Sequence, residues 1–372
     1  MGPTADSASE RAKGLMRGHL RALNPYQVPP ATGCIKLDAM ENPFPWPEEL
    51  RGPWAQRLAQ VQVNRYPDAA ATALKERLRR HYAIATDEAI CIGNGSDELI
   101  QLLALAYGGP GRVIMTPEPG FSMYRIIALA TGSGYCGVDL NPDFSLNTEA
   151  MLAAMTREPP ALLFIAQPNN PTGNLFEAKA LTRIIEACPG LVVLDEAYGP
   201  FSSADFSAWT RRHPNLVGLR TLSKVGLAGL RLGVLFGAEA WLEPLERIRL
   251  PYNVGTLSQA SATFALEHFE VLQAQLNRLI QERSRLAAHF ANLSAVEGFH
   301  SEANFILLRL AQDARAVHER LRDHHRILVK CLHGTHPLLT QCLRVTVGAP
   351  EENDALLNAL EECLHRPYPV GN

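Results

Sequence analysis

Short apolar runs alternate with helix-length segments between residues 89 and 237, and this pattern constrains the fold more than any other feature. The runs are Ala89–Ile92, Arg112–Thr116, Tyr135–Leu140, Ala161–Ala166, Leu191–Leu194, Leu216–Arg220 and Leu232–Phe236. Asp97–Tyr107 and Glu177–Ala187, which lie between them, show helical spacing of apolar residues. Continuously apolar strands are typical of sheets buried on both faces. The pattern therefore predicts an α/β fold with a mostly parallel sheet covered by helices.

The remaining segments predict a second, smaller α+β domain. Residues 257–290 carry one long helical pattern without Gly or Pro, and strands near 304–309 and 342–347 alternate with helices near 311–324 and 351–365. The stretch ENPFPWPEELRGPW is too rich in proline to continue as a helix or a central strand. We expect an N-terminal arm over 1–32, a linker with part of the small domain over 33–64, a large domain over 65–270 and a small C-terminal domain over 271–372.

Composition narrows the class of protein. The chain has 372 residues, 47% of them apolar, and a net charge of −3, which gives no global attraction for nucleic acid or an anionic membrane. Its seven cysteines are scattered without a C-x-x-C pair, which is typical of reduced thiols in the cytoplasm. The N-terminal sequence lacks the apolar core of a signal peptide, and no apolar run approaches the ~18–20 residues of a membrane span. We expect a cytoplasmic protein.

Polar residues directly follow several of the apolar runs, at the strand ends where open α/β sheets bind ligands. Gly93–Ser96 opens a helix whose free N–H groups suit a phosphate, although for this segment taken alone a simple turn capped by Ser96 is the favoured interpretation. Asn170 lies in the rigid turn PNNPTG, which fixes the position of its amide or merely joins a strand to a helix.

Two further strand ends carry groups that can react. Asp195 ends a buried run, where a carboxylate needs a cationic partner, either a ligand's ring nitrogen or an arginine, and Tyr198 can reach the same ligand. Lys224 follows Ser223 among small and apolar residues, where desolvation can leave its amine neutral and nucleophilic, although most lysines are simply solvated. With Arg231, these groups together suit one cofactor that carries a phosphate, a phenolic oxygen, a ring nitrogen and an aldehyde.

The motifs GSDE, PNNPTG, DEAY and SKVGLAGLRLG resemble those of the fold-type-I pyridoxal-phosphate aminotransferases, over about residues 24–353. The additional motifs NPYQ, ENPF, NRYPD, NFILL and CLRVTVG resemble the histidinol-phosphate aminotransferase family within that class. This resemblance implies a homodimeric enzyme of histidine biosynthesis that moves an amino group between L-histidinol phosphate and 2-oxoglutarate.

The resemblance also implies roles for individual residues. Lys224 bonds the cofactor and moves the proton, Asp195 pairs with the ring nitrogen, and Tyr198 and Asn170 bind the phenolic oxygen. Phe121 stacks on the ring of the cofactor, and Tyr66 reaches the cofactor of the neighbouring subunit. The groups that bind the cofactor phosphate are Gly95, Ser96, Asp97, Ser223 and Arg231. Two details depart from many relatives: Phe121 stands where Tyr is common, and the spacing from Lys224 to Arg231 is one residue shorter.

Substrate contacts implied by the resemblance are Tyr26, Lys330 and Arg344. Arg344 matches the arginine that receives the carboxylate of glutamate, and the phosphate of histidinol phosphate would occupy the same region. Many relatives have Arg where this chain has Lys330, which keeps the charge but loses the two-point grip of a guanidinium.

Other functions remain open from the sequence. An aromatic amino-acid aminotransferase and a decarboxylase of a phosphorylated amino acid share the cofactor motifs, and a regulatory module that binds pyridoxal phosphate without turnover is the alternative outside enzymes. The histidines near the C-terminus (His324, His325, His333 and His336) lack the spacing of a metal motif, so we expect no metal site.

Overall fold

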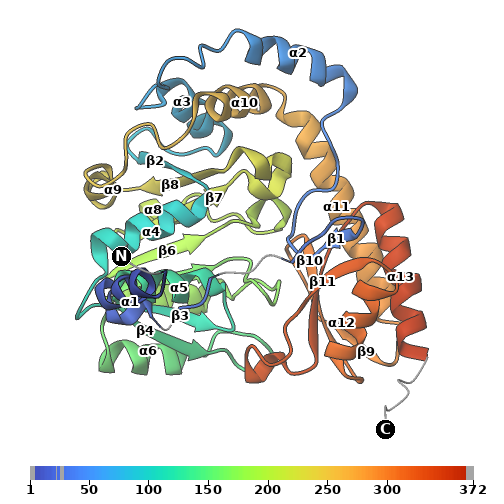
Figure 1. Ribbon diagram of the computed structural model, residues 1–372. Coiled ribbons are helices and arrows are strands. Elements are labelled where there is room, and N and C mark those ends of the chain that lie inside the picture. The colour runs from blue at the N-terminus through green and yellow to red at the C-terminus, as the bar shows by residue number, and fades with distance from the viewer. Residues whose placement is uncertain (1–4, 22, 26–28, 366–372) are drawn as a thin grey trace.

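The computed structural model describes residues 5–21, 23–25 and 29–365, and they form two β-sheets with helices around them (Figure 1). The larger sheet has seven strands in the order β2 (Ala89–Asn94), β8 (Leu232–Gly237), β7 (Leu216–Thr221), β6 (Leu191–Asp195), β5 (Pro160–Ala166), β3 (Val113–Glu118) and β4 (Gly134–Asp139). β8 runs antiparallel to β2 and β7 on its two sides, and the other adjacent strands of this sheet are parallel. The predicted α/β fold is confirmed, and each predicted strand of this sheet is present.

Helices cover both faces of the larger sheet because its strands are apolar on both sides. Leu162 and Phe164 of β5 pack on one face, and Leu163 and Ile165 pack on the other. The first face carries α4 (Ser96–Tyr107), α5 (Ser122–Thr131) and α9 (Glu239–Glu246); the second carries α6 (Thr148–Arg157), α7 (Ala178–Ala187) and α8 (Trp209–Arg212). Beyond β2 lie α2 (Glu48–Ala59), α3 (Thr72–His81) and α10 (Thr256–Glu267) (Figure 1).

The smaller sheet has five strands in the order β1 (Ile35–Leu37), β11 (Ile327–Cys331), β12 (Cys342–Thr346), β10 (Phe305–Leu310) and β9 (Val296–Gly298). Its outer face packs on α11 (Phe269–Phe290), α12 (Ala314–Asp323) and α13 (Pro350–His365). The described part of the chain begins with the helix α1 (Ala5–Leu15). Five short helical turns complete the structure of the described residues: η1 (Gly18–Leu20), η2 (Gly199–Phe201), η3 (Ser223–Leu227), η4 (Ala228–Leu230) and η5 (Pro337–Leu339). The sequence missed β1, β9 and β11, and the predicted domain boundaries stay predictions.

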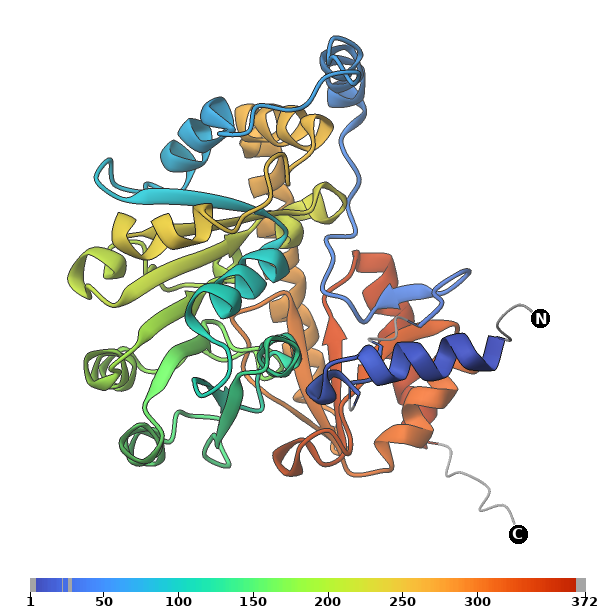
Figure 2. The ribbon, with the colours of Figure 1, turned by 60° about the vertical axis from the view of Figure 1, so that its left-hand side comes forward.

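Two local predictions are wrong. The pattern over 257–290 is two helices, because His268 between α10 and α11 has φ −121° and ψ 34°. Many residue types adopt this conformation, so no Gly or Pro marks the break. The proline-rich stretch is partly helical, since α2 continues through Pro53; α2 has no buried residue, so water can satisfy the carbonyl that the proline leaves without a partner. The arm contains the helix α1, which Figure 2 shows as a separate rod.

The two sheets face each other across the space that holds the candidate site. The outer face of the smaller sheet is apolar, whereas Lys330 and Arg344 stand on its inner face at paired positions of β11 and β12. No helix among the described residues is long and apolar enough to cross a membrane.

Candidate active site

A cavity of about 370 Å³ lies between the carboxyl ends of the large-sheet strands and the inner face of the smaller sheet. Most of the predicted site residues line it: Ser96, Asp97, Phe121, Asn170, Asp195, Tyr198, Ser223, Lys224, Arg231, Lys330 and Arg344. Gly95 adjoins it as the residue before α4. The fold therefore brings together side chains that are up to about 250 positions apart in the sequence.

One end of the cavity is built to bind an anion. Gly95 has φ +81°, and a Cβ there would stand 2.6 Å from the Arg231 guanidinium, so only glycine leaves room for the arginine beside the start of α4. Arg231 Nη2 lies 3.3 Å from Asp97 Oδ2, and its backbone carbonyl accepts the Gly95 N–H. Ser223 also lines the cavity, and its hydroxyl accepts from Thr221 Oγ1 at 2.9 Å. The shorter spacing between Lys224 and Arg231 therefore still brings the guanidinium to this helix start.

A buried carboxylate stands at the centre of the cavity wall. Asp195, the last residue of β6, is 4% exposed; its Oδ2 accepts from the Tyr124 hydroxyl at 2.7 Å and its Oδ1 accepts from the Ala197 N–H at 3.0 Å. Burial raises the pKa of Asp195 to about 6, and the Tyr124 hydrogen bond opposes that rise. A cationic N–H in the cavity would stabilise the ionised form.

Tyr124 is a candidate functional residue that the sequence analysis missed. It stands on α5 three residues after Phe121, and its ring packs edge-on against Phe121 with centroids 5.4 Å apart. It thus supports both the predicted stacking ring and the carboxylate. Its position three residues after Phe121, one helical turn on, is a weak signal, because the contact with Asp195 spans 71 positions.

A hydrogen-bonded chain joins the two sheets. Asn170 Nδ2 donates to the Tyr198 hydroxyl at 3.2 Å, and Asn170 Oδ1 accepts from Arg344 Nη1. Arg344 Nη2 also donates to the Asp38 carbonyl at 2.9 Å. Burial raises the pKa of Tyr198, so its phenol is protonated and can donate to an oxygen in the cavity.

Lys224 projects into the same space from the tight turn η3. The positive φ of Gly226 (+114°) permits that turn, and a Cβ there would meet Asn42 Nδ2 at 3.0 Å. Lys224 Nζ donates to the Ala39 carbonyl at 3.1 Å. Burial, with a further contribution from the Arg344 charge, lowers the pKa of Lys224 to about 8. About a tenth of this amine is therefore neutral at pH 7, far more than for an ordinary lysine, and can act as a nucleophile.

These groups fit pyridoxal phosphate. The anion-binding end suits its phosphate, the Asp195 carboxylate suits its ring nitrogen, and the amine of Lys224 suits its aldehyde. The charge of Asp195 supports this fit, because Asp195 is a buried carboxylate without a cationic partner among the described residues, and a protonated ring nitrogen would supply one.

Tyr66 does not line the cavity. Tyr66 is 80% exposed and stacks on Tyr252 with ring centroids 4.5 Å apart, so its predicted contact with a neighbouring subunit's cofactor stays a prediction. Tyr26 lies outside the described residues.

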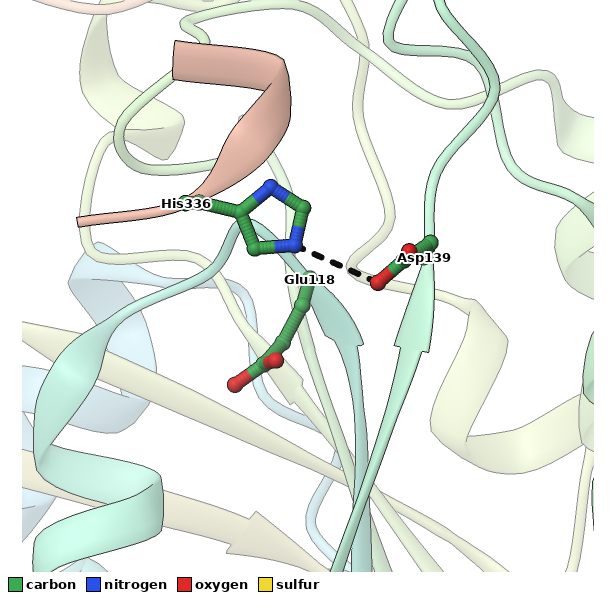
Figure 3. A group of neighbouring side chains, drawn as sticks. All are labelled: Glu118, Asp139 and His336. Atoms are coloured by element: carbon green, nitrogen blue, oxygen red, sulfur yellow. Dashed lines mark hydrogen bonds and ion pairs between the residues drawn. The ribbon is translucent and has the colours of Figure 1, made fainter. Parts of the chain in front are cut away.

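His336 lies close to two carboxylates. The ligand atoms of Glu118, Asp139 and His336 lie within 4.8 Å of one another (Figure 3). His336 Nδ1 accepts the Leu338 N–H at 3.2 Å, so in the neutral ring Nε2 carries the proton and faces Asp139 Oδ1 at 3.2 Å. A metal-binding histidine usually donates through its other nitrogen, which is the opposite arrangement. The geometry favours an imidazole–carboxylate hydrogen bond, and the expected absence of a metal stays a prediction.

Comparison with known proteins identifies the class to which this fold and site belong. Residues 32–360 match the sequence profile described as aminotransferase class I and II, and the chain belongs to that family. Within it, the chain is 48% identical to histidinol-phosphate aminotransferase 2 of Nitrosococcus oceani over 353 residues, 95% of this chain and 98% of the relative. It is also 48% identical to the histidinol-phosphate aminotransferase of Chromobacterium violaceum, over 93% of this chain and 97% of the relative. This chain is therefore a member of the histidinol-phosphate aminotransferase family.

A solved structure gives the same result for the fold. The histidinol-phosphate aminotransferase of Sinorhizobium meliloti, in complex with pyridoxal-5'-phosphate, superposes with a TM-score of 0.85 at 26% identity, covering 94% of this chain and 97% of that one. The predicted fold-type-I architecture and family are thereby confirmed, and the family implies pyridoxal phosphate as the cofactor.

The pKa of Lys224 gives a testable pH dependence. A lysine attacks an aldehyde only as the neutral amine, whose share falls about tenfold for each pH unit below the pKa. With a pKa of about 8, we expect the rate at which the cofactor-free protein bonds pyridoxal phosphate to rise up to about pH 8 and then level off. Stopped-flow absorbance would measure it, and a rise that continues to pH 10 would contradict the lowered pKa.

The Tyr124 hydroxyl gives a second testable pH dependence, that of cofactor binding. A donated hydrogen bond favours the ionised carboxylate, so Tyr124→Phe should raise the pKa of Asp195 further. We expect cofactor affinity to weaken on the acid side, with that limb displaced by about one pH unit to higher pH. Tyr107→Phe, which removes a hydroxyl bonded to the Trp241 carbonyl outside the cavity, is the matched control. Superimposable pH profiles for the two variants would show that Tyr124 has no such effect.

Proposed function

We propose that this protein transfers an amino group reversibly between L-histidinol phosphate and 2-oxoglutarate, giving imidazole acetol phosphate and L-glutamate, in the cytoplasmic synthesis of histidine. The observation that carries the proposal is a buried, easily deprotonated lysine in a cavity whose opposite wall presents two adjacent cations, Lys330 and Arg344. The buried lysine supports amine chemistry at a carbonyl, and the two adjacent cations support an anionic substrate.

Pyridoxal phosphate is the proposed cofactor, and when bound it supplies an electron sink for the substrate's α-carbon. The start of α4 from Gly95 through Ser96 and Asp97, with Ser223 and Arg231, would hold its phosphate. Asp195 would keep the ring nitrogen protonated, and Phe121 would cover one face of the ring. The phenol of Tyr198 and the amide of Asn170 would donate to the ring oxygen.

Lys224 would act twice. Its neutral amine would hold the cofactor through the aldehyde and, once a substrate amine is bound in its place, would accept the proton from the substrate's α-carbon. The cavity supports this second role, because the Ala39 carbonyl 3.1 Å from Nζ gives the displaced amine a hydrogen-bond acceptor.

The substrate phosphate would lie against the inner face of the smaller sheet. Lys330 and Arg344 occupy paired positions on β11 and β12, so their side chains point to the same side. Arg344 can grip two oxygens, and Lys330 has no carboxylate partner among the described residues, which leaves its charge available to a dianion. Tyr26 is the third proposed contact.

A homodimer with shared active sites is part of the proposal. Tyr66 and its stacking partner Tyr252 are 80% and 41% exposed, and Val63 and Leu250 nearby in the sequence are 69% and 72% exposed. Exposed apolar side chains of this kind are typical of surfaces that a partner covers. Tyr66 would reach the phosphate of the cofactor in the neighbouring subunit.

Substrate preference tests the proposal. Steady-state kinetics with 2-oxoglutarate as acceptor should give a kcat/KM for L-histidinol phosphate that exceeds the value for L-phenylalanine at least about 100-fold, the discrimination expected when charged groups meet a phosphate. A preference for phenylalanine would support an aromatic aminotransferase instead. Release of carbon dioxide from a phosphorylated amino acid would support a decarboxylase, and binding of the cofactor without turnover would support a regulatory module.

Lys330 gives a more specific prediction. Lys330→Ala should raise KM for histidinol phosphate about tenfold, because a charged contact to the phosphate is lost, and should raise KM for glutamate less. Lys179→Ala, on the exposed side of α7, serves as the control. Equal changes for both substrates would place Lys330 outside the phosphate site.

A further inference from the structure

The proposed reaction makes two unlike substrates use one cavity in turn. If phosphate and α-carboxylate share the Lys330–Arg344 end, the remaining arms differ in charge: glutamate ends in a carboxylate, whereas histidinol phosphate ends in an imidazole that carries an N–H. The first arm needs a cationic donor and the second needs an acceptor. The residues that contact the cofactor do not supply both a cationic donor and an acceptor. The wall that faces the substrate arm must therefore supply them.

An ion pair between Lys36 and Glu41 offers a donor and an acceptor side by side. Both residues line the cavity, and Lys36 Nζ lies 2.7 Å from Glu41 Oε2. Their side chains are 34% and 44% exposed, so a ligand can reach them. A pair that is open to solvent is held only weakly and can part when a ligand offers one member a better partner.

The other carboxylates of the cavity are committed or covered. Asp195 is buried against Tyr124, and Oδ1 of Asp38 is shielded from solvent. Asp97 is as exposed as Glu41, but it stands in the first turn of α4 beside the Arg231 guanidinium, at the end of the cavity assigned to the cofactor phosphate. Of the carboxylates that line the cavity, Glu41 is thus the one in reach of a substrate arm.

The position of the pair suits the arm rather than the phosphate end. Lys36 on β1 pairs with Leu328 on β11, and Lys330 stands two residues further along β11 on the same face. The cations Arg344, Lys330 and Lys36 therefore follow one another across three adjacent strands of the inner face. Strands lie about 4.8 Å apart, so a small bifunctional substrate anchored at Arg344 can reach the β1 end with its other arm.

The segment that carries Glu41 is fixed to the smaller sheet. Met40 N donates to Thr346 Oγ1 at 3.0 Å, and the Met40 carbonyl accepts from Asn304 Nδ2 at 3.0 Å. The preceding carbonyl of Ala39 is the one that Lys224 contacts. Glu41 is thus held close to the reacting amine, and its negative charge is among those that favour the protonated form of Lys224.

We propose that the Lys36–Glu41 pair reads the side-chain arm of both substrates: Lys36 binds the distal carboxylate of glutamate and 2-oxoglutarate, and Glu41 accepts the imidazole N–H of histidinol phosphate. This inference rests on the proposed function. Each substrate uses the member of the pair that the other leaves, and the neutral pair adds no net charge to the cavity between turnovers.

Half-reaction kinetics of the cofactor-loaded enzyme test the pair. The variants Glu41→Gln and Lys36→Met are compared by single-turnover absorbance with L-histidinol phosphate and with L-glutamate, to separate apparent affinity from maximal rate. We expect Glu41→Gln to weaken the apparent affinity for histidinol phosphate about tenfold or more and to change that for glutamate less than threefold. Lys36→Met should do the reverse, with maximal rates little changed in either case.

The control is Glu297→Gln, which removes an ion pair of comparable exposure (Glu297 with Arg309, 2.9 Å) outside the cavity and should change neither affinity. Circular dichroism of each variant checks the fold. Equal losses for both substrates in both variants would overturn the proposal in favour of a purely structural pair. A loss confined to histidinol phosphate in Lys36→Met would assign Lys36 to the phosphate and overturn it too. Failure of the unmodified enzyme to convert histidinol phosphate would instead overturn the proposed function, and this inference with it.

Discussion

Replacing Lys224 by alanine should lower the rate of transamination at least about 10⁴-fold, the scale seen when an enzyme loses its reacting nucleophile. The reason lies in its surroundings: the amine is buried, contacts the Ala39 carbonyl and has a pKa lowered to about 8. Two other lysines line the cavity, Lys36 and Lys330, but neither stands on the turn next to Asp195 and Tyr198, so neither can replace Lys224. Rate measurements with histidinol phosphate and 2-oxoglutarate would give the loss.

The same variant should still bind pyridoxal phosphate, because the phosphate contacts around Gly95 and Arg231 remain. Cofactor retained after gel filtration, measured by its absorbance, tests this separately from activity. Lys179→Ala, a substitution on an exposed helix face, is the control for a change of lysine as such. Turnover within tenfold of the unmodified protein would remove Lys224 from its proposed role.

Asp195→Asn should cost about 10³-fold in kcat, comparable to the loss of a preorganised electrostatic partner elsewhere. The amide keeps the shape of the side chain but cannot stabilise a protonated ring nitrogen, so the electron sink weakens. The effect should be large because Asp195 is 4% exposed, where water cannot replace the lost charge.

Glu196 offers a neighbouring comparison for that variant. Its carboxylate is also buried, but it pairs with Arg220, 3.0 Å away, outside the cavity. Glu196→Gln should therefore affect stability more than the spectrum of the bound cofactor, whereas Asp195→Asn should alter the spectrum. A loss below about tenfold in Asp195→Asn would mean that another group holds the ring nitrogen.

The sequence could predict the parts of the site that short motifs carry. Asp195 ends a buried strand, Asn170 and Lys224 stand a few residues after the ends of two others, and parallel strands bring their carboxyl ends to one edge. The roles of these three residues toward the cofactor came from the resemblance to a family. The fold places Lys330 and Arg344 on the wall of the cavity that faces them.

What the sequence missed depends on contacts between distant segments. Tyr124 meets Asp195 across 71 positions, and Lys36 stands on a three-residue strand too short to show a periodic pattern. The break at His268 escaped for a different reason, because its backbone conformation needs no special residue. Pattern analysis detects periodicity and special residues, and these features show neither.

Net charge gave a further incomplete picture. The chain carries −3 overall, yet the proposed ligands are all anions. Local groups resolve this: the start of α4 with Arg231 at one end of the cavity, and Lys330 with Arg344 at the other. Binding of anions here should therefore depend on these few residues and weaken with salt only modestly, since the cavity is partly screened from solvent.

A single-turnover experiment tests the central claim most directly. The purified protein loaded with pyridoxal phosphate is mixed with L-histidinol phosphate, the cofactor absorbance is followed, and 2-oxoglutarate is then added. The account predicts full conversion of the bound cofactor by histidinol phosphate, and its return by 2-oxoglutarate with about one L-glutamate formed per subunit. A spectrum that histidinol phosphate leaves unchanged, while L-phenylalanine converts the cofactor, would contradict it.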